Sequence, residues 1–118
     1  MRLRLLALTI LATLCGCVET NETQGGGRAS DGGAVSGTLE TVPGSQVVSI
    51  TLKSQAGWFC NATFLHADDE PQPAKAPLSC SDRRKGEIQV FLNRHTSQAA
   101  GFYRLSDGTT GQVNFGLF

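Results

Sequence analysis

Apolar and polar residues alternate in three separate stretches of this chain, and that period of two restricts its fold more than any other feature. The stretches are residues 48–53, 88–93 and 113–117. Successive side chains of a strand point to opposite faces of its sheet, so this period is typical of half-buried strands rather than helices. Aromatic residues also cluster in 57–65 and 101–105. We therefore expect an all-β domain of five to six antiparallel strands, arranged as a small barrel-like meander or as a sandwich.

The tetrapeptide Ser106-Asp107-Gly108-Thr109 lies between two of these runs. Asp-Gly readily adopts the positive φ angles of a type I′ turn, which joins two strands in a tight hairpin. We therefore expect a hairpin of this type at the C-terminal end of the domain.

The first seventeen residues have the pattern of a bacterial lipoprotein signal. Arg2 and Arg4 precede an apolar run at 5–14, and the small residue Gly16 stands before Cys17. This order matches the charged, apolar and small-residue regions of a secretory signal. We expect Cys17 to carry a lipid, which makes the membrane a partner through the N-terminus.

Other interpretations of this segment remain open. Cys15 is a competing lipidation site, but bulky Leu14 would then stand beside the cleaved bond. The segment could also be an ordinary secretory signal or a membrane anchor, although crossing a bilayer takes about 20 apolar residues. Because Val18 rather than an aspartate follows Cys17, the Gram-negative pattern predicts the outer membrane, with the domain facing the periplasm or the cell surface.

A change in composition divides the chain into three parts. We expect a signal peptide at 1–16, a lipidated cysteine and flexible Gly-rich tether at 17–34, and a β-rich globular domain at 35–118. The middle part contains Gly25-Gly26-Gly27 and many Thr, Ser and Asn residues. It has too few apolar side chains to offset the entropy lost on ordering. No strand precedes these glycines and no Gly-Lys-Ser/Thr follows, which disfavours a phosphate-binding loop.

Cys60 and Cys80 flank a segment, 66–77, that contains three prolines and three consecutive acidic residues. Proline lacks the amide that a sheet ladder needs, so we expect this segment to be a surface loop. In an oxidising envelope compartment, the two cysteines are expected to form a disulfide rather than a metal site or a catalytic thiol. Closing a loop of about 20 residues would stabilise the fold by roughly 3 kcal/mol.

The other titratable residues give no positive sign of catalysis. His66, Asp68, Asp69 and Glu70 offer metal ligands, but they lack the alternation and the glycine of a calcium loop. No acidic or nucleophilic residue stands at a spacing from His95 that is typical of a catalytic site. We expect no metal site, no cofactor and no catalytic residue, although a triad assembled from distant positions stays open.

Four basic residues are the candidates for binding an anion or a partner: Arg83, Arg84, Lys85 and Arg94. Adjacent cations in a turn can hold a phosphate, a lipid head group or an acidic partner. The alternative is a solubilising turn that protects the edge of the next strand. Loss of the two arginines of the signal leaves eight basic and ten acidic residues, a net charge of −2. This balance argues against a nucleic-acid binder.

The C-terminal half resembles a known group of proteins. Residues 80–86 are Cys-Ser-Asp-Arg-Arg-Lys-Gly, and residues 105–109 are Leu-Ser-Asp-Gly-Thr, followed by Phe115-Gly116. This is similar to small proteobacterial envelope lipoproteins of unassigned activity, in which the first segment is Cys-Ser-Asp-Gly-Arg-x-Gly. Arg83 stands where that pattern has glycine, so we expect a different turn there. The resemblance covers 80–116 and implies a β fold and an envelope location, without implying an activity.

These observations predict a lipid-anchored envelope protein with a non-enzymatic binding or structural role, whose partner is an envelope protein or polymer. The alternatives are a small periplasmic hydrolase and a binder of anionic envelope polymers through the three adjacent cations. A hydrolase needs a concave site with converging titratable groups. An interaction module would instead expose an apolar patch, for which Trp58, Phe59 and Tyr103 are candidates.

Overall fold

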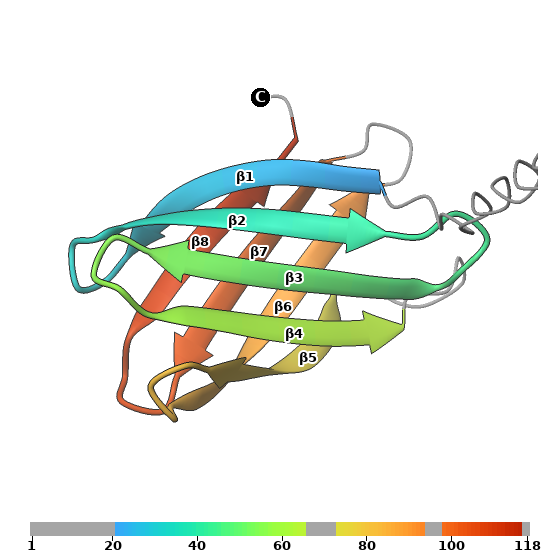
Figure 1. Cartoon of the computed structure of the whole chain (residues 1–118). Helices are drawn as coiled ribbons and strands as arrows, with labels where there is room; N and C mark the ends of the chain where they lie inside the picture. The colour runs from blue at the N-terminus through green and yellow to red at the C-terminus, as the bar shows by residue number, and fades with distance from the viewer. Residues whose placement is uncertain (1–20, 66–72, 94–97, 117–118) are drawn as a thin grey trace, which may run out of the picture.

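The computed structural model describes residues 21–65, 73–93 and 98–116, which form a closed barrel of eight antiparallel strands (Figure 1). Each strand pairs with the next along the chain, and the last pairs with the first. These residues include no helix long and apolar enough to cross a membrane. The strands are β1 (Asn21–Ala29), β2 (Ala34–Thr41), β3 (Val47–Ser54), β4 (Phe59–Leu65), β5 (Ala74–Cys80), β6 (Lys85–Asn93), β7 (Gln98–Leu105) and β8 (Thr110–Phe115).

The all-β, antiparallel and barrel-like prediction is confirmed, but the strand count of five to six is wrong. The predicted stretches correspond to β3, β4, β6, β7 and β8. Strands β1 and β5 account for most of the difference, because three glycines in β1 and a proline in β5 weaken their strand patterns. The chain also closes on itself instead of forming two packed sheets, so the sandwich alternative is wrong.

The Gly-rich segment expected at 17–34 to be a flexible tether contains strand β1. This strand pairs with β2 along nearly its whole length and with β8 over its second half. A Cβ atom built on Gly25 would overlap the carbonyl oxygen of Asn114, and one on Gly27 would overlap that of Gln112. The glycines therefore permit a close approach of the two strands that close the barrel. The domain boundary at 34/35 is correspondingly wrong.

The hairpin predicted at Ser106-Asp107-Gly108-Thr109 is present, but its turn type differs. The backbone N–H of Leu105 donates to the carbonyl of Thr109, and that of Gly108 donates to the carbonyl of Leu105. Gly108 has φ 94°, whereas Asp107 does not have a positive φ. The connection is therefore a three-residue loop, in which a type I turn is followed by one left-handed residue, rather than a type I′ turn.

The same two hydrogen bonds close the β1–β2, β3–β4 and β5–β6 hairpins. Ser-Asp-Gly or Ser-Asp-Arg marks three of the four loops, and its aspartate accepts a hydrogen bond from the N–H two residues later. The expectation of a different turn at Arg83 is wrong, because Arg83 adopts the left-handed conformation, at φ 72°, in place of glycine. The left-handed residues are Gly32, Gly57, Arg83 and Gly108.

Arg83→Gly is expected to raise the free energy of unfolding by roughly 0.5 to 1 kcal/mol. A left-handed conformation costs an L-residue about 1 to 2 kcal/mol, and the greater freedom of glycine in the unfolded chain offsets part of the gain. Gly108→Ala, at the matching position of the β7–β8 loop, should lower stability by a similar amount. Chemical denaturation measures both variants, and a destabilised Arg83→Gly would contradict the proposed strain.

Among the described residues, strands β4 and β5 share the shortest ladder of the barrel. Within the described residues they pair at two positions, Cys60 with Cys80 and Asn61 with Ser79. A disulfide joins Cys60 to Cys80, as predicted. The disulfide therefore lies at the β4–β5 seam, where two neighbouring strands share the fewest backbone pairs among the described residues.

The proline-rich segment is not a loop throughout, because β5 begins at Ala74. Residues 66–72 lie outside the described part of the chain. Ala76 is buried inside the barrel, so shortening of the connection has to stop before β5. Pro77 pairs with Glu87 of β6 and has no pairing to β4, and a strand tolerates proline where one of its edges is free.

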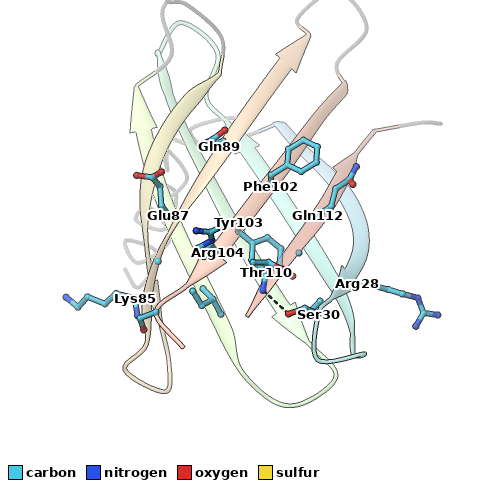
Figure 2. Close-up of a pocket in the computed structure, with 15 residues that line it drawn as sticks. Arg28, Ser30, Lys85, Glu87, Gln89, Phe102, Tyr103, Arg104, Thr110 and Gln112 are labelled. Atoms are coloured by element: carbon cyan, nitrogen blue, oxygen red, sulfur yellow. Dashed lines mark hydrogen bonds between the residues drawn. The ribbon is translucent and has the colours of Figure 1, made fainter. Parts of the chain in front are cut away.

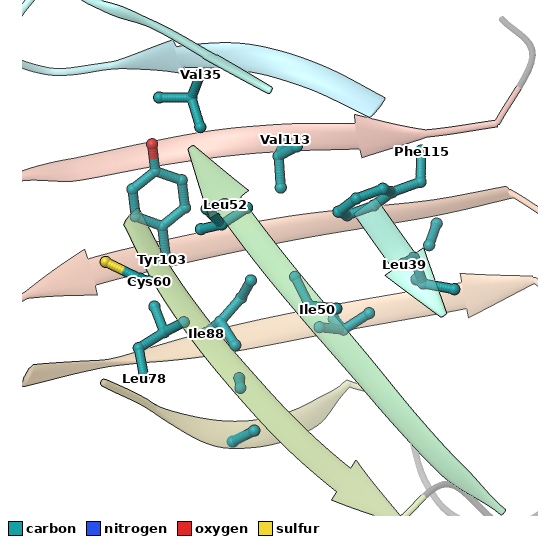
Figure 3. Packing of buried hydrophobic residues seen from close by; sticks show 14 of the residues in the cluster. Val35, Leu39, Ile50, Leu52, Cys60, Leu78, Ile88, Tyr103, Val113 and Phe115 are labelled. Carbon is teal, nitrogen blue, oxygen red and sulfur yellow. The ribbon is translucent and has the colours of Figure 1, made fainter. Parts of the chain in front are cut away.

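The hydrophobic core lies inside the barrel and is filled by the inward-facing positions of all eight strands (Figure 3). Burying these apolar side chains is the dominant favourable term in folding such a domain. Glycine or alanine stands at several inward positions, such as Gly37, Ala62 and Gly101, and leaves room for the larger residues opposite. The largest fully buried side chains are Phe115, Ile50, Leu52, Leu78, Ile88, Val90 and Val113.

Candidate functional site at the barrel mouth

The two ends of the barrel are built differently (Figure 1). One end, which we call the tight end, carries the four three-residue loops. The opposite end, which we call the mouth, carries the β2–β3 loop at 42–46, the start of β1 and the end of β8. A ligand can therefore enter the barrel only through the mouth if side chains close the tight end.

Trp58 and Tyr103 fill the tight end. Their side chains are 7% and 3% exposed, and their rings meet edge to face with centroids 6.4 Å apart. The guanidinium of Arg84 lies 5.2 Å from the centre of the Trp58 ring, within the range of a cation–π contact. The expectation that Trp58 and Tyr103 form an exposed patch is therefore wrong, whereas Phe59 is 53% exposed.

Arg84 connects two loops of the tight end. Its Nε donates to Asp82 at 2.8 Å, and its Nη1 donates to Asp107 at 2.9 Å. Desolvation lowers the pKa of Arg84, but the hydrogen bonds to Asp107 and Asp82 outweigh it and raise the pKa overall. The pKa of Asp107 is lowered, first because the backbone N–H of Thr109 donates to its carboxylate. The charge of Arg84 is thus neutralised within the protein.

The three predicted cations that the structure describes have different surroundings. Arg84 is held by its two carboxylates, and Arg83 occupies the left-handed position of its loop. Lys85 is exposed at the start of β6. Arg94 lies outside the described residues.

Several other predicted residues also lie outside the described part: Cys17, His66, Asp68, Asp69, Glu70 and His95. Among the residues that the structure describes, no three metal-ligating side chains come together.

The mouth holds a cavity of about 350 Å³. Its apolar wall includes Leu39, Val48, Ala99 and Phe115, and Thr41 belongs to its polar part. No titratable side chain lines the cavity within the described residues. The volume falls within the range of sites for small molecules, which are mostly apolar and commonly occupy the mouths of β-barrels. The cavity therefore combines a buried apolar wall with a polar rim, and it can hold a compact molecule whose apolar part lies inward.

A defined turn forms part of the rim of the mouth. The N–H of Ser45 donates to the carbonyl of Val42 at 3.0 Å, and Gly44 has φ 82°. Pro43 and Gly44 thus occupy the two central positions of a type II turn, which favours proline first and glycine second. The hydroxyl of Ser45 also accepts a hydrogen bond from the N–H of Val47. These bonds fix the rim beside the cavity.

Sequence patterns identify only part of this site. Phe115 lies in a predicted strand. Leu39 and Thr41 belong to β2, which was not predicted because Gly37 interrupts the apolar side chains on its inward face. Two signals point to this region: the alternation of β2 from Val35 onward and the Pro43-Gly44 dipeptide, which marks a turn.

Comparisons with known proteins bear on the fold. No protein-family model matches the chain, and no curated protein matches it. A de novo designed fluorescence-activating β-barrel is 18% identical with a TM-score of 0.59, over 86% of this chain and 94% of that chain. A redesigned β-barrel, mFAP0, bound to DFHBI, is 16% identical with a TM-score of 0.61, over 81% of this chain and 95% of that chain. At these identities the likeness shows the barrel fold alone.

Proposed function

We propose that this protein is a lipid-anchored binding protein of the bacterial outer membrane, which holds a small apolar or aromatic molecule in the mouth of its barrel. The observation that carries the proposal is the cavity of about 350 Å³ with Leu39, Val48 and Phe115 in its wall. The interior of an eight-stranded barrel is just wide enough to be filled by side chains or to hold one small ligand, and here the packed core leaves space at the mouth.

The hydrolase alternative receives less support from the same cavity. General acid–base or nucleophilic catalysis needs titratable groups that converge on the substrate. The described lining of the mouth supplies threonine, asparagine, serine and glutamine side chains as its polar groups. These can orient a ligand by hydrogen bonds but offer no activated nucleophile, so we propose binding without catalysis.

Binding at the mouth is tested with the neutral fluorescent probe N-phenyl-1-naphthylamine and the purified protein. We expect one probe molecule to bind per protein and to fluoresce more strongly than the free probe. Ala99→Leu places a larger side chain in the wall of the cavity and should weaken binding by roughly tenfold. That loss corresponds to displacing about two methylene groups of buried contact, at about 0.8 kcal/mol each.

The control for this variant is Phe59→Ala, which removes an exposed aromatic ring from the outer face of β4. It should leave probe binding unchanged, since Phe59 is not part of the cavity. Unchanged binding in Ala99→Leu, or an equal loss in Phe59→Ala, would place the probe on the outer surface and contradict the proposal.

The proposed anchor is tested separately by metabolic labelling with a fatty-acid analogue. Cys17→Ala should abolish the label, and Cys15→Ala should leave it, because Gly16 provides the small residue before the lipidated position. Persistence of the label in Cys17→Ala would contradict the assignment. Recovery of the labelled protein in inner-membrane fractions would contradict the proposed outer-membrane location.

A further inference from the structure

A groove on the outer face of the barrel crosses β6, β7, β8 and the end of β1 (Figure 2). Its volume is about 1070 Å³, and it is separate from the mouth because the two sites share no lining residue. Figure 2 shows Lys85 and Arg28 on opposite sides of the groove, with Arg104 and Phe102 between them.

Inward-facing packing fixes the floor of this groove. A Cβ atom built on Gly86 would overlap the carbonyl oxygen of Arg104, and one built on Gly111 would overlap the hydroxyl of Tyr103. Tyr103 is itself buried. The backbone beneath the groove thus lies directly against the core, so the groove is formed before any ligand arrives, which lowers the cost of binding.

The groove has an excess of positive charge. Three exposed cations line it, Arg28, Lys85 and Arg104, together with one carboxylate, that of Glu87. Three positive charges against one negative charge leave a net charge of +2. None of these four side chains forms an ion pair with another described residue, in contrast to Arg84. Glu87 stands directly opposite Arg104 in the β6–β7 ladder and offsets part of its charge, whereas the residues directly opposite Arg28 and Lys85 are uncharged. The groove therefore keeps positive charge for an anionic ligand.

The remaining side chains of the groove suit sugar rings. Phe102 is 44% exposed and meets Phe91, which is 43% exposed, edge to face at 6.0 Å. Gln89 and Gln112 line the groove. The amide of Gln112 already donates one hydrogen bond to Asn114, and an amide can both donate and accept hydrogen bonds, as hydroxyl-rich ligands require. An exposed aromatic ring offers a flat apolar surface to the C–H groups of a pyranose.

We infer that this groove binds an acidic polysaccharide, with carboxylate groups held by Arg104, Arg28 and Lys85 and a sugar ring packed on Phe102. Guanidinium groups bind carboxylates through directed, paired hydrogen bonds. A bilayer surface is a less suitable ligand, because the cations line a hollow that also contains Glu87 and two glutamines. This site goes beyond the proposed ligand of the mouth and does not depend on it.

The test titrates the purified full chain with trigalacturonic acid, and in parallel with its methyl ester, while backbone amide shifts are followed by NMR. We expect the acid to shift amides of β6, β7 and β8, and the ester to bind about tenfold more weakly. Arg104→Gln should weaken binding of the acid by about tenfold, and Phe102→Ala by about fivefold.

Matched controls on the opposite part of the barrel distinguish this site from general attraction. Lys53→Gln removes an exposed cation from β3, and Phe59→Ala removes an exposed ring from β4; both should bind the acid as the parent protein does. Equal binding of acid and ester, equal losses in the control variants, or binding to phosphatidylglycerol vesicles without binding to the acid would overturn the inference. Unchanged amide spectra away from each substitution confirm that the variants remain folded.

Discussion

Replacing Cys60 and Cys80 together by alanine is expected to lower the free energy of unfolding by about 2 to 5 kcal/mol. The disulfide joins directly opposite residues of the β4–β5 seam, where the described ladder is two residue pairs long. Cys60 is also fully buried, so the variant loses packing in addition to the cross-link. Denaturant unfolding with and without a reducing agent measures the effect.

Hydrogen exchange should locate this loss at the seam. Amides of β4 and β5 are expected to lose protection first, whereas those of β7 and β8, which pair along their lengths, should keep theirs. The reduced parent protein is the control, because it retains both side chains and lacks only the bond. Equal stability of the oxidised and reduced proteins, or free thiols at both positions in a non-reduced peptide map, would refute this role of the disulfide.

Gly27→Ala is expected to destabilise the barrel by about 3 kcal/mol, near the upper end of the usual cost of overpacking. The new Cβ would overlap the carbonyl oxygen of Gln112 on β8. Backbone cannot move aside as a flexible side chain can, so the β1–β8 pairing that closes the barrel has to loosen. Thermal unfolding and amide exchange in β1 and β8 measure the change.

The same strand supplies the matched controls. A Cβ on Gly26 would meet the carbonyl oxygen of Val35 at 3.7 Å, an ordinary van der Waals contact. Gly26→Ala should therefore leave stability almost unchanged, whereas Gly25→Ala, whose Cβ would overlap the carbonyl of Asn114, should resemble Gly27→Ala. Equal tolerance of alanine at all three positions would restore the interpretation of this segment as a tether.

The strands that could be predicted from sequence are those with one apolar face. In β3 and β6 the inward positions hold branched apolar residues, such as Ile50 and Ile88, so a period of two is visible. In β1 the inward positions Gly25 and Gly27 have no side chain, because another strand lies against them. The close approach of the two strands arises from barrel closure. A glycine in the sequence does not by itself distinguish a close approach from a flexible segment.

The candidate site was harder to predict for a related reason. The cavity at the mouth combines residues of β2, β3, β7 and β8, such as Leu39 and Phe115, which come together when the sheet closes. At the tight end, Arg84 meets Asp107, 23 positions away in sequence, so a run of three cations does not reveal which of them is already paired. Local patterns predicted the disulfide between the two cysteines and one hairpin. The hairpin prediction depended on adjacent residues, and the disulfide prediction depended on the expected oxidising compartment.

If Cys17 is acylated as proposed, the position at which β1 begins would determine how the whole domain is oriented at a membrane. Asn21 starts this strand and lines the mouth, and it follows Cys17 by four residues in the sequence. Four residues of fully extended chain span at most about 14 Å. With Cys17 acylated as proposed, the mouth is held next to the bilayer surface and the tight end points away from it. A molecule bound in the mouth would then be exchanged with the lipid interface, while partners in the surrounding solution would meet the loops at the opposite end.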